Sequence, residues 1–338
     1  MPKDNENILP LTGPVEPSEP QGFTPEQMIR CDECLRANPP TRVACLYCSA
    51  PLPITESSAQ LRRPVLRPPE KHQPAFSNIL WPTDNELSSE KIAEAAALLK
   101  LSAENLQRII AEKTPLPVAF TASQEEATLV FDRLWALGLP TLIVGDHTLG
   151  LFRVKRIKAM KVEERYALVQ QPGTRETTEV AWDNVAMIIT GRLFTRRVEI
   201  QERKTRRAEN EIVNASEFSS DEAVIDLYAY NGTTWRVSAN GFDFSCLGER
   251  MTLIANENIA TLQQVIIERA PRAKFVDSYN RLRPMLDLVW GPQQETQSSG
   301  WRRERPGKLS VGLATVKSNE SQFTRFSRLQ AELYLNLR

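Results

Sequence analysis

Apolar residues recur at the spacing of an α-helix in several parts of the chain. The pattern turns helical at Ser88 and predicts a helical hairpin over residues 85–114. Further helices are predicted at 258–269 and at 278–290. The last segment, 319–338, is predicted to be an amphipathic helix that either packs on its own domain, which we favour, or anchors a partner.

Residues 115–151 read as a strand, a helix and a second strand. The helix is expected to begin after Ser123, with Glu126 completing a capping box, and to end at Gly138. Its apolar face is expected to point toward the strands. The residues on that face are Ala127, Val130, Phe131, Leu134 and Trp135.

Strands dominate residues 152–290. The clearest signal is a hairpin in which AVIDLYAY, starting at Ala223, and TTWRVSA are separated by Asn231-Gly232. Because Asn-Gly suits the positive φ angles of a two-residue type I′ turn, we predict that turn here.

The remaining strands of this region are expected at 153–170 and 185–200, with one helical turn at 182–185 between them. The charged stretch 201–211 is interpreted as an excursion from the sheet, with strands resuming near residue 223. A strand-rich region closed by a helix is the expected result.

Three segments are expected to lack packed structure. Residues 1–22 combine prolines and acids with few large apolar side chains and predict a disordered arm. The proline density of 55–84 predicts a stiff linker, and the polar composition of 291–318 predicts a second linker. The fold class is therefore predicted to be α+β and multidomain.

Composition limits the functions open to this chain of 338 residues. With 42 basic and 42 acidic residues it has no net charge, so any binding to a polyanion must depend on a local patch. The amino terminus lacks the basic start and apolar run of a signal peptide, which predicts a soluble, cytosolic protein with no membrane segment.

Four of the five cysteines form two CxxC pairs in the segment 23–54: Cys31, Cys34, Cys45 and Cys48. Four thiolates at this spacing are the ligand set of a structural zinc ion, which leaves no open position for water or substrate. The alternative is a redox dithiol, but one CxxC at a strand-to-helix junction would suffice for that chemistry. We therefore predict a zinc module that is unfolded without its metal.

The spacing Cys31-x2-Cys34-x3-Asn38-x6-Cys45-x2-Cys48 resembles that of the RanBP2-type zinc finger and of related bacterial zinc ribbons. The resemblance implies a module that recognises single-stranded RNA or a ubiquitin-like protein, or an appended ribbon of unspecified ligand.

This resemblance covers residues 29–53 and departs from the family at the reading positions. Ile29 stands where the family usually has Trp, and Leu35-Arg36 stands where ubiquitin-binding members have Thr-Phe. For stacking on RNA bases the module offers guanidinium and aromatic groups beside two acids. These residues are Arg30, Arg36, Arg42 and Tyr47, with Asp32 and Glu33.

Two further resemblances rest on the order of elements. The region 152–290 resembles bacterial PH-like domains, which implies binding of ligands or partners without catalysis. The strand-helix-strand unit resembles small prokaryotic signal-transducing domains of the ferredoxin-like sort.

Candidate catalytic groups are few. The two histidines are His72, in the proline-rich segment, and His147, which with Asp146 follows a predicted strand. The Asp146-His147 pair suits either an ordinary turn, which we favour, or an unrecognised active site. Cys246 is interpreted as a buried structural thiol. The common nucleotide-binding, zincin and serine-hydrolase motifs are absent from the sequence.

Two basic clusters are candidates for phosphate or acidic partners, or for solvated faces, which their acidic neighbours favour. They are Arg203, Lys204, Arg206 and Arg207, and Trp301-Arg302-Arg303. The leading hypothesis from the sequence is a non-enzymatic, cytosolic, zinc-containing adaptor that binds protein partners. The alternatives are single-stranded RNA binding through the zinc module, and an enzyme near Asp146 and His147.

Overall fold

The computed structural model describes residues 22–53, 55, 58, 61–64, 66, 69, 74–150, 154–205, 211–305 and 308–336. The chain divides into two compact units, Met1–Pro64 (unit 1) and Val65–Arg338 (unit 2). The expected disordered arm, apart from Gly22, and His72 lie outside the described residues.

Unit 1 is built around the cysteines rather than around a large apolar core. It contains a 3-10 turn (η1, Pro25–Gln27) and two short antiparallel strands, β1 (Ile29–Arg30) and β2 (Ala37–Asn38). Its buried cluster consists of Ile29, Cys31, Cys45 and Leu52. Arg62, from the predicted linker, is buried here and donates to the carbonyls of Leu52 (2.9 Å) and Pro53 (2.7 Å).

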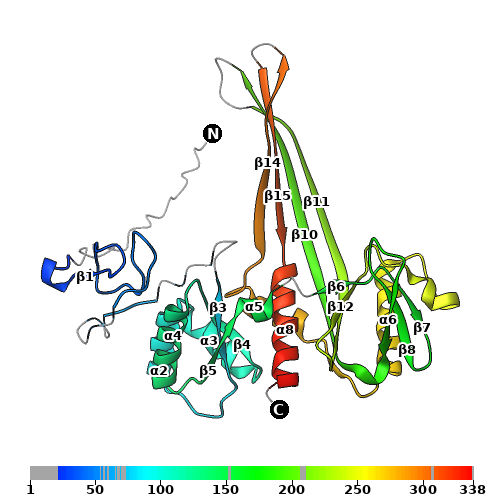
Figure 1. Ribbon diagram of the computed structural model, residues 1–338, viewed down its shortest axis with the longest axis horizontal. Helices are drawn as coiled ribbons and strands as arrows, with labels where there is room; N and C mark the ends of the chain where they lie inside the picture. The colour runs from blue at the N-terminus through cyan, green and yellow to red at the C-terminus, as the bar shows by residue number, and fades with distance from the viewer. Residues whose placement is uncertain are drawn as a thin grey trace, which may run out of the picture. The chain divides into compact units, whose positions relative to one another are not determined.

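Unit 2 begins with a three-stranded sheet covered by helices (Figure 1). The order is β4-β3-β5, and β3 is antiparallel to both neighbours. The elements are β3 (Phe76–Leu80), α2 (Ser89–Leu99), α3 (Ala103–Ala111), β4 (Leu116–Thr121), α4 (Gln124–Ala136), β5 (Thr141–Gly145) and α5 (Asp146–Leu149).

The predicted helices of this region are confirmed, with Ser88, Ser102 and Ser123 each accepting a backbone N–H as the N-cap of α2, α3 and α4. The expected linker is wrong at β3, which is the central strand of the sheet. The strand, Phe-Ser-Asn-Ile-Leu, lies between Pro74 and Pro82, which fall outside the paired residues and leave the ladder intact.

One expected core residue is exposed. Ala127, Val130 and Leu134 of α4 are buried, but Trp135 is 60% exposed and stacks on Phe131 with ring centroids 5.8 Å apart. The buried face of α4 is therefore narrower than the apolar pattern suggested.

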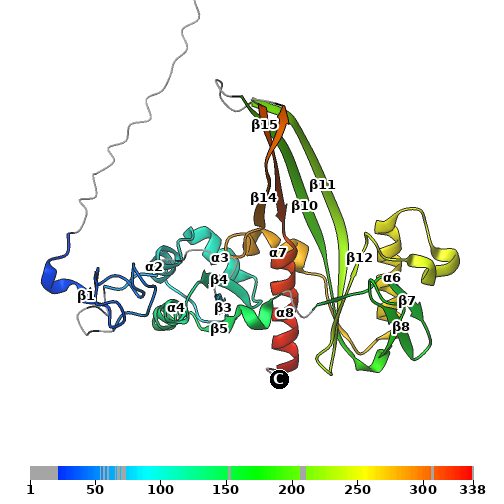
Figure 2. The same ribbon diagram turned by 45° about the horizontal axis from the view of Figure 1, so that its top comes forward.

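The next part of unit 2 is a seven-stranded sheet, in the order β14-β15-β10-β11-β12-β6, with β13 pairing Met187–Ile189 of β10. Its strands are β6 (Lys155–Arg156), β10 (Val185–Thr205), β11 (Glu211–Ala229), β12 (Thr234–Ser238), β13 (Lys274–Val276), β14 (Gln293–Arg305) and β15 (Lys308–Ser318). In Figures 1 and 2 the strands β10, β11, β14 and β15 run side by side beyond the helices of the unit.

We call the part of this sheet from Thr195 to Thr205 of β10, with the strands paired beside it, the upper sheet, and the rest the lower sheet. The remaining elements flank the lower sheet. They are the sheet β7-β8-β9 (Ala159–Val162, Tyr166–Gln170, Thr177–Ala181), η3 (Trp182–Asn184), η4 (Phe244–Arg250), α6 (Ala255–Arg269), α7 (Tyr279–Leu286) and α8 (Glu320–Asn336). The helical turn at Trp182 and the helices at 258–269 and 278–290 are thus confirmed within a few residues.

The two faces of the lower sheet belong to different cores. Val224 and Tyr228 of β11 pack with Phe323, Phe326 and Leu329 of α8 in one cluster, which also includes α2, α3 and the first sheet. Ile225 and Leu227 pack with α6 and the β7-β8-β9 sheet in the other. Strand alternation at β11 therefore separates the two cores.

Two sequence predictions fail on the upper sheet. The described residues of the segment 201–211 are not an excursion, because β10 continues to Thr205 and β11 begins at Glu211; residues 206–210 lie outside the described part of the chain. Residues 293–305 and 308–318 are not a linker, because they form the paired strands β14 and β15. Most side chains of the charged stretch and of β14 are polar, so these residues lack the apolar alternation that marks a half-buried sheet. β15 alternates only over Leu309, Val311 and Leu313.

The Asn-Gly hairpin forms, but its turn differs from the prediction. The register pairs Tyr228 with Thr234, and the Ala229 N–H donates to the Thr233 carbonyl (3.0 Å), so the loop has three residues. Only Gly232 in it has a positive φ, +80°. This is the geometry of a type I turn followed by a left-handed residue, and it shifts β12 by one residue relative to a two-residue turn.

The last helix packs on its own chain, as expected. It lies against β10 at Gly191, where an added Cβ would be 2.6 Å from the Phe323 ring and 2.8 Å from that of Tyr279. Its polar residues are buried as well, so the helix is enclosed on more than its apolar face. The chain is accordingly a mixed α and β protein with several sheets.

Candidate metal centre

The two CxxC segments fold into matching turns. In the first, the Leu35 N–H donates to the Cys31 carbonyl (2.9 Å) and the Cys31 N–H to the Arg36 carbonyl (3.0 Å). In the second, the Ser49 N–H donates to the Cys45 carbonyl (3.1 Å) and the Cys45 N–H to the Ala50 carbonyl (2.8 Å). Each turn therefore presents its two sulfurs on a backbone of the same shape.

The fifth residue of each turn has a left-handed backbone. Leu35 has φ +59° and Ser49 has φ +60°. Residues other than glycine adopt such φ angles at a cost of about 1–2 kcal/mol. The matching turns and the matching strain show that both segments are held in one specific conformation.

The four sulfurs converge on one point, with every pair within 4.8 Å. Cys31 and Cys48 are 3.6 Å apart and Cys34 and Cys45 are 3.5 Å apart at Sγ, too far for a disulfide bond. A tetrahedral ion with metal–sulfur bonds of about 2.3 Å requires sulfur separations of about 3.8 Å. The cluster therefore fits one four-coordinate metal ion, with all four positions filled by thiols.

Asn38 joins the two turns and is completely buried. Its Nδ2 donates to the Arg36 carbonyl (2.9 Å) and to Cys45 Sγ (3.4 Å), and its Oδ1 accepts the Leu46 N–H (2.8 Å). Asn38 belongs to the motif, but its spacing alone does not assign it this role. The structure makes it the outer-shell residue that orients the ligands.

The surroundings of Cys45 favour its thiolate form. Burial raises the pKa of this thiol, but hydrogen bonds from the backbone N–H groups of Tyr47 and Cys48 and from Asn38 lower it to about 6. A ligand that loses its proton near neutral pH is prepared to bind a cation.

The outer surface of the module carries exposed apolar side chains. Leu35 is 64% exposed, Leu46 is 51% exposed and Tyr47 is 55% exposed. The guanidinium of Arg36 lies over the Tyr47 ring, 4.7 Å from its centroid. Two of the residues considered for RNA stacking therefore already stack on each other.

Asp146 and His147, although adjacent in the chain, have different surroundings. Asp146 begins α5, and its carboxylate accepts two hydrogen bonds from Arg325 of α8, at 2.6 and 3.0 Å. His147 is exposed. Asp146 thus ties α8 to the end of β5, which is a structural role.

Cys246, in η4, is partly buried and packs against the core that contains α6. Burial raises the pKa of its thiol, which favours the neutral, unreactive form. The interpretation as a packed structural thiol agrees with this position.

The register of the upper sheet places the two basic clusters beside each other. Arg203 of β10 and Arg302 of β14 both pair with Ser310 of β15, and Lys204 and Arg303 both pair with Leu309. Arg206 and Arg207 lie outside the described residues. Sequence spacing missed this proximity because 99 positions separate Arg203 from Arg302 along the chain.

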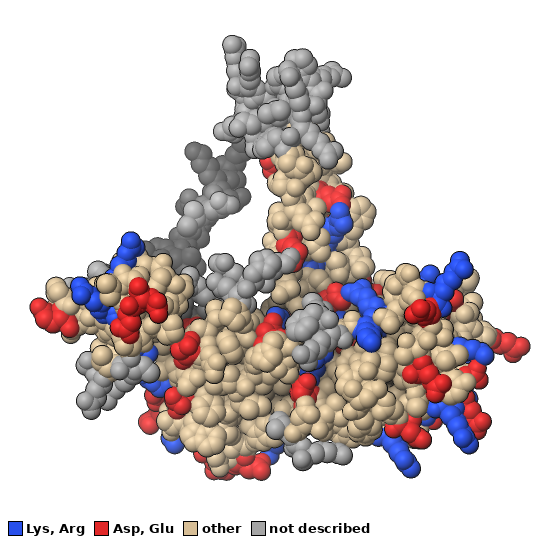
Figure 3. Space-filling view, viewed as in Figure 1, with Lys and Arg blue, Asp and Glu red and all other residues tan. Residues whose placement is uncertain are grey.

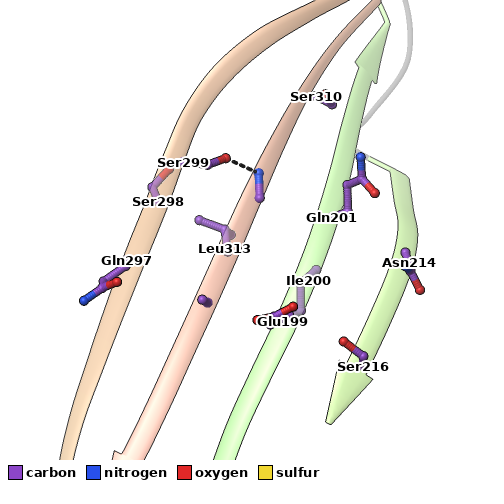
Figure 4. A pocket seen from close by; sticks show the side chains of 12 residues that line it. Glu199, Ile200, Gln201, Asn214, Ser216, Gln297, Ser298, Ser299, Ser310 and Leu313 are labelled. Atoms are coloured by element: carbon purple, nitrogen blue, oxygen red, sulfur yellow. Dashed lines mark hydrogen bonds between the residues drawn. The ribbon is translucent and has the colours of Figure 1, made fainter. Parts of the chain in front are cut away.

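A hollow of about 460 Å³, lined by polar side chains and by Ile200 and Leu313, lies on the sheet just below these rows (Figure 4). Gly312 and Ala314 of β15 form part of its lining. The Ser299 hydroxyl accepts the Gly312 N–H at 2.9 Å, across the hollow from Gln201 of β10. The other polar side chains that line it are Glu199, Asn214, Ser216, Gln297, Ser298 and Ser310.

A buried ion pair under α8 escaped the sequence analysis. Arg236 of β12 donates to both oxygens of Asp226 on β11, at 2.7 and 2.8 Å, and both side chains are fully buried. Ser327 of α8 donates to Asp226 (2.7 Å) and therefore accepts from the Tyr228 hydroxyl (2.8 Å). Burial lowers the pKa of Arg236, but the charge of Asp226 outweighs it and keeps the guanidinium ionised.

Comparisons with protein-family models, with curated proteins and with solved structures give no match for this chain. Within the described residues, no helix is long and apolar enough to span a membrane. On the face of unit 2 seen in Figure 3, acidic and basic side chains are interspersed.

Proposed function

We propose that this protein is a non-enzymatic, cytosolic adaptor in which a structural zinc ion holds a module that binds a protein partner. The observation that carries the proposal is the closed four-thiol cluster beneath an exposed apolar surface. Zinc suits four sulfurs in a tetrahedron, and with no ligand position open the ion stabilises a fold instead of activating water.

The surface of the module supports a role in binding. A module this small gains little from burying apolar groups, yet Leu35, Leu46 and Tyr47 remain exposed around the metal turns. Aromatic and aliphatic side chains held on a rigid backbone are typical anchors of protein interfaces. As part of this proposal, residues 29–53 resemble RanBP2-type fingers, and the later regions resemble PH-like and ferredoxin-like domains.

Metal analysis tests the first part of this proposal. Purified protein should contain one equivalent of zinc, and serine in place of Cys31, Cys34, Cys45 or Cys48 should remove it. Chelation should abolish the folded state of unit 1, because metal binding supplies most of its folding free energy. If the purified protein contains no metal, or if all four variants still bind it, redox chemistry would be the better explanation of the cysteines.

A comparison of captured partners tests the second part. The Tyr47→Ser variant should lose a partner that wild type retains in a native pull-down. Tyr230→Ser is the matched control, because Tyr230 is also 55% exposed but lies in unit 2. Identical partners for all three proteins, or none above background, would count against an adaptor role of this surface.

Single-stranded RNA binding through the zinc module is the second candidate function. The stack of Arg36 on Tyr47 favours it, since guanidinium and aromatic planes are the platforms on which unpaired bases stack. The Tyr47→Ser variant should then lose affinity for single-stranded RNA while Tyr230→Ser retains it. Equal affinity of the two variants would exclude this platform.

A further inference from the structure

The end of the upper sheet has a charge that the chain as a whole lacks. The last three paired rows of β14, β15 and β10 contain nine positions, of which six are arginine or lysine and none is acidic. These six are Arg203, Lys204, Arg302, Arg303, Arg305 and Lys308. Three acids lie close to these rows: Glu304, at the bulge of β14, Glu211, opposite Arg203 on β11, and Glu202, in the adjoining row of β10.

The basic positions occupy both faces of the sheet. Arg203 and Arg302 share one row, Lys204 and Arg303 the next, and Arg305 and Lys308 the third. Successive rows of a sheet belong to opposite faces. A planar anionic surface would meet only one of these faces, whereas the two walls of a nucleic-acid groove, or a strand that wraps the sheet end, would meet both.

The hollow in Figure 4 continues this surface down the same strands. Its hydroxyl and carboxamide side chains, such as Gln201, Asn214 and Ser299, are groups that commonly bind phosphate and sugar oxygens. The one acid that lines it, Glu199, has its carboxylate 2.7 Å from Arg197 and is thereby neutralised. Ile200 and Leu313 also line the hollow, so its hydroxyl and carboxamide groups lie beside apolar ones and can meet the sugar as well as the phosphate of a polar chain.

We propose that the end of the β14-β15-β10-β11 sheet, together with this hollow, binds the sugar-phosphate backbone of a nucleic acid. The site is separate from the zinc module and does not depend on the proposed function. It reads backbone charge, so binding is expected to be weakly dependent on sequence and strongly dependent on salt.

The test uses the full chain and a variant in which Arg203, Lys204, Arg302 and Arg303 are changed to Gln. The control changes four exposed basic residues elsewhere in unit 2 to Gln, with the same loss of charge. They are Lys91, Arg108, Arg269 and Arg272. The probes are a labelled mixed-sequence DNA duplex, the corresponding single strands of DNA and RNA, and vesicles that contain phosphatidylserine. Thermal melting verifies that each variant is folded.

Wild type and control should bind a nucleic-acid probe, and the ratio between duplex and single strands shows which form fits. The variant lacks four phosphate contacts, so its affinity should depend less on salt. Between about 50 and about 200 mM salt, the affinity of wild type should fall roughly 100-fold more than the affinity of the variant. Equal salt dependence of wild type and variant overturns the proposal, as does binding to vesicles alone or to none of the probes. The Cys31→Ser variant should bind nucleic acid as wild type does. If Cys31→Ser loses nucleic-acid binding while the sheet variant retains it, the binding site lies in the zinc module and the proposal is wrong.

Discussion

Replacing Asn38 with Ala should weaken metal binding without touching a ligand. The change removes two amide hydrogen bonds between the two CxxC turns and a third to Cys45 Sγ. At about 1 kcal/mol for each bond, the loss is about 2–3 kcal/mol. That corresponds to metal affinity about 30- to 150-fold lower, which overlaps the loss of about 10- to 100-fold that is typical when hydrogen-bond partners of metal ligands are removed.

The assay is a competition between the protein and a chromophoric chelator for zinc. Asn85→Ala, at an exposed position in unit 2, provides the control for an asparagine change away from the module. Asn38→Asp should bind at least as weakly as Asn38→Ala, because a carboxylate would replace the amide that lies 3.4 Å from the Cys45 sulfur. Affinity of Asn38→Ala within about two-fold of wild type would refute the assigned role, since the expected loss starts at about 30-fold.

Three further tests leave the four metal ligands unchanged. Ser49→Gly should stabilise unit 1 toward chelator-induced unfolding by about 1 kcal/mol, because it relieves the φ of +60°, and no gain would contradict the strain. Asp226→Ala should lower the free energy of unfolding of unit 2 by about 3–5 kcal/mol in urea, because Arg236 is left buried without its partner. The double variant Asp226→Leu with Arg236→Met should recover most of that loss, and an equally unstable double variant would argue against it. Burial, with the charge of Asp226, raises the pKa of Tyr228, whereas an unfolded tyrosine ionises near about pH 10. Above about pH 10 the native state therefore binds more protons than the unfolded state, so the free energy of unfolding should fall as the pH rises. It should fall less steeply in Tyr228→Phe, and equal slopes for wild type and variant in urea unfolding would refute this.

The sequence predicts most of the elements whose signals are local. Each cap at Ser88, Ser102 and Ser123 depends on a side chain three residues from its partner, and the spacing of the cysteines brings the four sulfurs together. The hairpin of β14 and β15 carries no such signal. β14 is polar on both faces, and the short apolar alternation of β15 at Leu309, Val311 and Leu313 lies within a segment of polar composition. The pairing of β15 with β10, far away in the sequence, sets the place of both strands in the sheet.

The ion pair beneath α8 depends on the length of the hairpin loop, which the sequence prediction made one residue too short. Asn231-Gly232 indicated a hairpin, but a two-residue turn would have placed Arg236 opposite Leu227. The extra loop residue moves β12 by one position, so Arg236 pairs with Asp226 and both lie on the face that meets α8. Because the side chains of a strand alternate between faces, that single residue decides which core receives the charges. The buried polar residues of α8 then follow from the register, since Ser327 binds the carboxylate of Asp226 and Glu320 lies 3.3 Å from Arg236.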